Sequence, residues 1–217
     1  MTAPTLRRWP QALKREWLLY HLGDDRFRFM WDPPPPDEWV ALDCETTGLN
    51  VHRDEIISVG AVRIAGDCIL TSQRLELLVR PERRRVSAES ARVHGLLERE
   101  VVKGMDLDEA MMQLMRYIGS RPLVGYYLEF DVAMIDRAIF PRLGVGLPQP
   151  KIEVSAMFYD YKRRQLPPHQ HGAQIDLRFA TMMRELELPM FDAHDALNDA
   201  LMAALAFVKL RHLLAVT

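Results

Sequence analysis

Three consecutive stretches of strand-forming sequence restrict the fold of this chain more than any other feature. Residues 39–42 form an apolar run that ends at an acid, and residues 55–65 are rich in β-branched side chains. Residues 68–79 alternate between apolar and polar positions before a proline. Because so few residues separate these stretches, we predict three neighbouring antiparallel strands.

Strand and helix patterns alternate along the rest of the chain. We predict a helix over residues 106–118, a strand over 122–125, and helices over 130–140, 174–187 and 195–214. Asp106 and Glu109 have the spacing of a capping box for the first of these helices, and Asp195 is placed to cap the last. Hairpins followed by this alternation indicate an α/β fold, with one mixed sheet covered by helices.

The first 37 residues have a helical pattern and a proline run in place of the strand patterns that follow them. Apolar side chains recur at helical spacing over residues 5–22, and residues 33–36 are four prolines, which favour an extended connector. We therefore predict a helical extension and linker over residues 1–37 and one further domain over residues 38–217. Tryptophans of the extension are expected to pack back on that domain or to pair two subunits; docking of a protein partner is the alternative.

Composition gives no general indication of a charged partner. The 217 residues include 28 Lys and Arg against 30 Asp and Glu, for a formal charge of −2, so any nucleic-acid footprint must be local. There are two cysteines, no leader-like start, and no apolar stretch near the roughly 20 residues of a membrane span. We expect a cytoplasmic protein that makes no membrane contact.

A pair of acids marks the end of the first predicted strand. Asp43 and Glu45 lie two residues apart, so their side chains point to one face of the sheet while Cys44 faces the other. Two carboxylates on one face repel each other, and a divalent cation bound by oxygen atoms would hold them together. The simpler alternative is a strand end exposed to solvent.

Three further polar residues occupy similar junctions. Asp131 follows another apolar strand where a helix begins, His194 precedes the last predicted helix, and Asp199 lies in its first turns. Each taken alone is typical of a helix cap or a surface residue. Together with the acid pair they lie where the loops of an α/β sheet converge, which favours one shared site.

These residues resemble the motifs of the DEDDh 3′→5′ exonucleases, a family with a ribonuclease H-like fold that includes proofreading subunits, ribonuclease T and oligoribonuclease. The similar segments are residues 43–49 (DCETTGL), Phe130 with Asp131, His194 with Asp199, and residues 93–96 (VHGL). The resemblance extends over residues 39–210, about four-fifths of the chain. It implies a ribonuclease H-like mixed sheet and 3′→5′ exonuclease activity.

The resemblance also implies a site with two divalent metal ions, Mg²⁺ or Mn²⁺. Asp43, Glu45 and Asp199 would bind one ion, and Asp43 and Asp131 would bind the second, about 3.5–4 Å away. His194 would act with the first ion to generate the attacking hydroxide, and the second ion would stabilise the departing 3′-oxygen. The product would be a nucleoside 5′-monophosphate.

By the same resemblance, the segment after the acid pair would bind the 3′-terminal nucleotide. Thr46, Thr47 and Gly48 would line the pocket, Leu49 would lie against the base, and His94 would lie near the sugar. A plain turn is the alternative for the Thr-Thr-Gly sequence.

Other polar and aromatic residues have less specific interpretations. Many family members have an asparagine a few residues before the second-motif aspartate, and here that stretch is Tyr126, Tyr127, Leu128 and Glu129. The ring of Tyr126 or Tyr127 would either stack on a base or belong to the core. The basic runs at residues 83–85 and 162–164 would contact phosphates or lie on a solvated face. For the second run we favour phosphate contact, because it falls between the second and third motifs.

We expect a 3′→5′ exonuclease that acts on single-stranded DNA ends in proofreading or repair, without the C-terminal polymerase-binding tail of proofreading subunits. One alternative is an exonuclease of RNA or short oligonucleotides, since phosphodiester chemistry does not distinguish the sugars. Another is a non-catalytic module that binds nucleic-acid ends or a protein partner. Clustered, mutually repelling carboxylates would give such a module no advantage, so we favour the enzyme.

Overall fold

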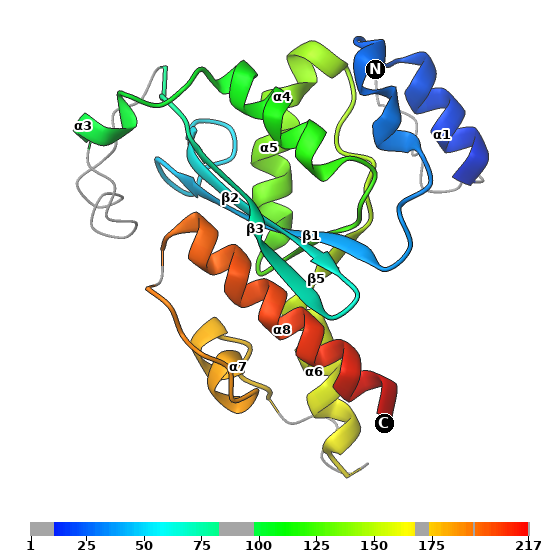
Figure 1. Ribbon diagram of the computed structural model, residues 1–217, viewed down its shortest axis with the longest axis vertical. Helices are drawn as coiled ribbons and strands as arrows, with labels where there is room; N and C mark the ends of the chain where they lie inside the picture. The colour runs from blue at the N-terminus through cyan, green and yellow to red at the C-terminus, as the bar shows by residue number, and fades with distance from the viewer. Residues whose placement is uncertain (1–10, 83–97, 168–173, 193, 217) are drawn as a thin grey trace.

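A mixed five-stranded sheet lies at the centre of the molecule and has helices on both faces (Figure 1). The computed structural model describes residues 11–82, 98–167, 174–192 and 194–216. The strands are β1 (Glu38–Thr46), β2 (Ile56–Ala65), β3 (Cys68–Leu78), β4 (Leu123–Gly125) and β5 (Lys151–Glu153). Their order is β3-β2-β1-β4-β5. The predicted antiparallel arrangement of the first three strands is confirmed, and β4 and β5 continue the sheet in parallel.

Two layers of helices cover this sheet. The helical elements are α1 (Gln11–Tyr20), the 3₁₀ helix η2 (Asp25–Trp31), α3 (Glu98–Val101), α4 (Leu107–Ile118), α5 (Leu128–Leu143), α6 (Val154–Gln165), α7 (Phe179–Glu185) and α8 (Ala196–Val216). Val40 and Leu42 of β1 belong to a buried cluster with α4, α5 and η2, whereas Ala41 belongs to a second cluster with α6, α7 and α8. The alternation of side chains along β1 therefore supplies both halves of the core.

The cap predictions are confirmed for two aspartates. The side chain of Asp106 accepts a hydrogen bond from the backbone of Asp108 at 2.9 Å, and Asp195 accepts one from Asn198 at 2.9 Å. The capping box is only half formed, because Glu109 accepts from the Gln113 side chain at 3.4 Å. These contacts fix where α4 and α8 begin.

The sequence patterns were less accurate between residues 128 and 187. The helix predicted over residues 174–187 is wrong in its first part: α7 begins at Phe179, because the Asp176 carboxylate accepts from the backbone of Arg178 at 3.0 Å and from the Thr181 hydroxyl at 2.8 Å. Such side-chain bonds compete with helical ones. The patterns also missed β5 and α6. The helix predicted over residues 130–140 is shorter than the observed α5, which continues through Pro141.

The N-terminal extension packs on the same core as the sheet. Phe27, Met30 and Trp31 of η2 are buried in the cluster that contains Val40 and Leu42, in agreement with the expectation that a tryptophan packs back. The helix predicted over residues 5–22 is observed as α1, and residues 1–10 lie outside the described residues. A domain boundary after residue 37 stays a prediction.

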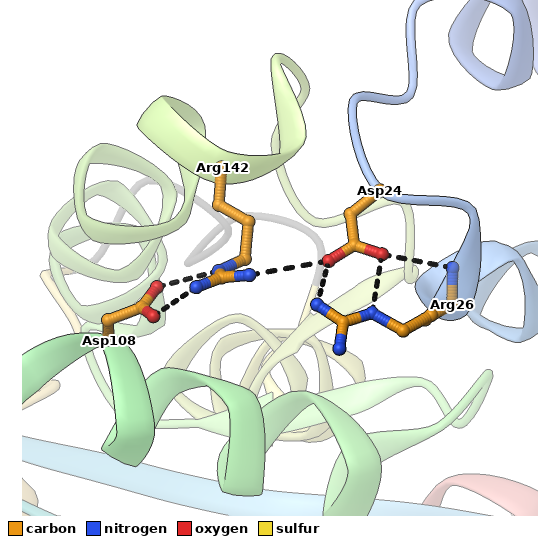
Figure 2. A network of polar contacts seen from close by, with 4 residues as sticks. All are labelled: Asp24, Arg26, Asp108 and Arg142. Atoms are coloured by element: carbon orange, nitrogen blue, oxygen red, sulfur yellow. Dashed lines mark hydrogen bonds and ion pairs between the residues drawn. The ribbon is translucent and has the colours of Figure 1, made fainter.

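An ion-pair network fastens the extension to α4 and α5 (Figure 2). The Arg142 guanidinium lies between two carboxylates, with Nε 2.7 Å from Asp108 Oδ1 and Nη1 3.4 Å from Asp24 Oδ2. Arg26 forms a second pair with Asp24, with Nη2 2.7 Å from Oδ2. Hydrogen bonds to these guanidinium groups hold the pKa values of Asp24 and Asp108 below their usual range.

Within the described residues, no helix has both the length and the apolar character required to cross a bilayer.

Candidate active site

The acid pair lies on the sheet face covered by α8. Cys44 belongs to the buried cluster on the α4 and α5 side, whereas Asp43 and Glu45 share the orientation of Ala41. Asp43 pairs with Gly60 of β2, and Glu45 pairs with Ser58. The two carboxylates therefore point the same way from the middle strand of the sheet, as the two-residue spacing predicts.

Gly60 allows the start of α8 to rest directly on the sheet beside Asp43. A Cβ atom at Gly60 would lie 2.2 Å from the backbone nitrogen of Leu197 and 2.3 Å from the carbonyl carbon of Ala196, distances that no side chain can occupy. This close approach brings the first turns of α8 to the acid pair. Our sequence interpretation missed Gly60; the signal was a glycine inside a run of β-branched residues.

The residues around the start of α8 join the acid pair. Glu45, His194 and Asp199 each offer a metal-ligating atom, and these atoms lie within 4.8 Å of one another. The backbone N–H of His194, which has a left-handed conformation with φ 66°, donates to Asp199 Oδ2 at 3.1 Å. A left-handed residue turns the chain sharply before the helix. The imidazole and the Asp199 carboxylate thus face the same group on β1.

Asp131 reaches the site from α5, on a different part of the sheet. It lies in the first turn of that helix and is 4% exposed. Glu153, at the end of β5, accepts from the Leu128 backbone at 3.0 Å through Oε2 and from the Ser155 backbone at 3.1 Å through Oε1. One carboxylate therefore fixes the start of both α5 and α6, a role that the sequence patterns missed together with β5.

The site carboxylates destabilise one another's ionised forms. Burial raises the pKa of Asp43 and of Asp131 well above the usual range, and for Asp43 the charges of Asp131, Asp199 and Glu45 add to it. Burial and the nearby charges of Asp199 and Asp195 raise the pKa of Glu45 to about 7. Burial also raises the pKa of Asp199. Such mutual repulsion favours protonation or the binding of a cation.

No lysine or arginine among the described residues forms an ion pair with Asp43, Glu45, Asp131 or Asp199. Carboxylate oxygens and an imidazole are donors that suit hard and borderline divalent cations. The donor set therefore fits one or more divalent metal ions, and Asp43, Glu45, Asp131 and Asp199 are the residues that would hold them.

A cavity of about 540 Å³ opens over these acids. Thr46 and Leu49 line it, and the Leu49 side chain is 87% exposed. Thr47 and Gly48 serve the turn itself: the backbone of Glu55 donates to the Thr47 hydroxyl at 3.0 Å, and a Cβ at Gly48 would lie 2.6 Å from an Asp54 carboxylate oxygen. Thr46 and Leu49 therefore border the cavity while Thr47 and Gly48 form a turn, and nucleotide binding by this segment stays a prediction.

Two basic runs and His94 were also suggested by the sequence for substrate contact. His94 and the run at residues 83–85 are outside the described residues. Lys162 pairs with Glu185 at 2.9 Å, and Arg164 donates to the Leu214 carbonyl at 3.1 Å near the end of α8. Leu214 lies about 22 Å along the helix from Asp199, at about 1.5 Å per residue. Arg164 thus contacts α8 far from the acids, and phosphate contact by the run at residues 162–164 stays a prediction.

Known proteins resemble the chain over the part that forms this site. The profile of the RNase_T family, described as exonuclease, matches residues 40–207. A PolC-type DNA polymerase III of Thermotoga maritima is 24% identical over 184 residues, which cover 75% of this chain and 13% of that protein. An oligoribonuclease of Tropheryma whipplei is 30% identical over 115 residues, which cover 50% of this chain and 62% of that protein.

The fold has relatives among solved structures. Exonuclease I of E. coli in complex with a dT13 oligonucleotide superimposes with a TM-score of 0.66 at 15% identity, over 80% of this chain and 40% of that one. This similarity confirms the predicted ribonuclease H-like fold. Since the family profile matches residues 40–207, which is most of the chain, the chain belongs to the RNase_T exonuclease family.

Proposed function

We propose that the chain removes nucleotides from the 3′ end of single-stranded DNA and releases nucleoside 5′-monophosphates. The observation that carries the proposal is a cluster of four carboxylates without a basic partner among the described residues, together with His194, at one cavity. Such a cluster gains stability from bound cations, and a nucleic-acid phosphate is the group that cations would then attract.

Each side chain has a distinct task in this proposal. Divalent cations held by Asp43, Glu45, Asp131 and Asp199 would supply Lewis-acid stabilisation of charge on the phosphodiester group. His194 is exposed at the cavity, so its imidazole can accept a proton from the attacking water and pass it to solvent. Leu49, also exposed there, would lie against the terminal base.

The similar proteins include some that are named for DNA and one that is named for RNA, and we favour DNA as the substrate. The E. coli exonuclease I structure contains a DNA oligonucleotide, and the Thermotoga relative is a DNA polymerase. The Tropheryma relative is an oligoribonuclease, which makes short RNA the second candidate. A 2′-hydroxyl contact in the pocket would decide between the two sugars.

The test compares 5′-labelled single-stranded DNA and RNA of one sequence with Mg²⁺, Mn²⁺ or a chelator. We expect a ladder of shortened DNA that requires metal and disappears in Asp43→Asn, while the exposed acid variant Asp25→Asn keeps it. If RNA is shortened faster than DNA, the proposed substrate becomes RNA. Folded wild-type protein that binds oligonucleotides and shortens neither would contradict the proposed activity.

A further inference from the structure

Two adjacent tyrosines at the cavity have different environments. Tyr126 packs in the core, its ring stacked on Phe179 with centroids 4.6 Å apart, and its hydroxyl donates to the Leu177 carbonyl at 3.1 Å. Burial, followed by the neighbouring Tyr127, raises the pKa of Tyr126 to about 12, so this hydroxyl keeps its proton. Tyr126 is therefore accounted for by the structure of the core.

Tyr127 differs from Tyr126 mainly in its exposure, and a side-chain hydrogen bond joins the two tyrosines. Its side chain is 69% exposed, and its ring has an edge-on contact with Tyr126 at a centroid distance of 4.6 Å. It precedes α5 in a left-handed conformation, φ 53°, and its side chain makes no capping hydrogen bond. A bulky residue is unfavourable in that conformation, whereas asparagine adopts it readily.

The exposed ring lies at the same cavity as the acids. Asp43, Asp131 and Tyr127 all line it, as do the exposed side chains of Leu49 and Met190. Exposed apolar groups gathered at a site that binds phosphate suit a ligand with both a charged backbone and flat apolar rings. An unpaired nucleotide at a strand end has this combination.

We propose that Tyr127 is a specificity-determining residue whose ring stacks on an unpaired base of the strand end held at the carboxylates. The inference rests on the proposed function and deepens it, because an unpaired base can turn its face toward the ring, whereas a paired base is held in the duplex by its hydrogen bonds. The enzyme would then discriminate in favour of single-stranded ends through Tyr127, in addition to the contact with Leu49.

The test uses equilibrium binding, so that it does not depend on hydrolysis. Fluorescence anisotropy with Ca²⁺ gives the Kd for a single-stranded oligonucleotide and for the same strand with its last two nucleotides abasic. For Tyr127→Asn, which keeps the backbone conformation, we expect Kd to rise about 5- to 100-fold on the normal strand and to stay unchanged on the abasic one. Tyr127→Phe should restore the wild-type value.

A matched control is Tyr20→Asn, which removes another exposed tyrosine, 86% exposed, from α1. It should change neither Kd. If Tyr127→Asn changes both Kd values equally, or neither, the stacking role is wrong. If the wild-type protein binds and shows the predicted difference but hydrolyses nothing, the proposed activity fails while the stacking inference stands. Absence of any oligonucleotide binding overturns both.

Discussion

Two acidic clusters of this molecule differ in what accompanies the carboxylates. Asp24 and Asp108 lie against guanidinium groups, and their pKa values are lowered. Asp43 and Asp131 lie among other acids on buried strand and helix ends, and their pKa values are raised. The first cluster is complete within the chain and joins the extension to α4 and α5 (Figure 2). The second has no basic partner among the described residues, so its acids are left to bind a proton or a cation, and this is the pattern typical of a functional site.

The largest effect is expected when the second cluster loses Asp43, the carboxylate that our proposal assigns to both metal ions. Asp43→Asn should reduce kcat on single-stranded DNA by about 1000-fold, because metal ions supply several kcal/mol of stabilisation to the transition state. Calorimetric titration with Mn²⁺ should show weaker binding in the same variant. Asp108→Asn, in the paired cluster, should leave both measurements near the wild-type values. Equal losses in the two variants would remove the distinction between the clusters.

A second variant would move the two halves of the site apart without removing an acid. Gly60→Ala places a Cβ where the backbone of Leu197 lies, so the start of α8 and Asp199 must shift away from β1. We expect kcat to fall about 100-fold, since misplacement by about 1 Å has effects of this size. Gly66→Asn is the control: Gly66 has φ 57° with open space around it. An unaffected Gly60→Ala enzyme would show that α8 does not position the site.

The pH dependence of stability should have opposite signs in the two clusters. Glu45 has a folded pKa of about 7 against an ordinary value of 4.5, so the metal-free protein should lose stability as the pH rises through that interval. Glu45→Gln should therefore raise Tm at pH 8 by a few degrees and leave Tm almost unchanged at pH 4. About 1 kcal/mol corresponds to about 2–4 °C at this chain length. A lower Tm for Glu45→Gln than for the wild-type protein at pH 8 without metal would contradict the repulsion between Glu45 and the neighbouring carboxylates.

The smallest effect is expected in the paired cluster. The pKa of Asp108 is lowered in the folded protein. The ionised side chain therefore contributes fully to folding stability when the pH is above the ordinary pKa of 3.8, and this contribution is lost as the pH falls below 3.8. Asp108→Asn should lower Tm at pH 8 by only a degree or two, because the Asp108 side chain is 47% exposed and such pairs are worth about 0–1 kcal/mol. High salt should reduce the difference, and a salt-independent loss would indicate a packing defect instead.

Local patterns were sufficient for features that depend on neighbouring residues. The alternation along β1 predicted that Asp43 and Glu45 point away from Cys44, and the caps Asp106 and Asp195 were predicted from their positions before helices. Both β4 and β5 have three residues, but only Ile152 of β5 is apolar, so β5 gives no apolar run and was missed together with Glu153. The Asp176 side-chain bonds, which displace the start of α7, likewise depend on a local competition that helical periodicity does not describe.

The sequence by itself determined which residues carry the charges, which face of the first strand they occupy, and which family motifs they match. Only the tertiary structure decided that the start of α8 rests on Gly60, that Asp131 is buried near Asp43, and that Arg164 contacts the far end of α8. It also distinguished Tyr126, which lines the cavity but is half-buried against the core, from the exposed Tyr127. Proximity and burial arise from packing between segments distant in the chain, and they set both the pKa values and the space open to a substrate.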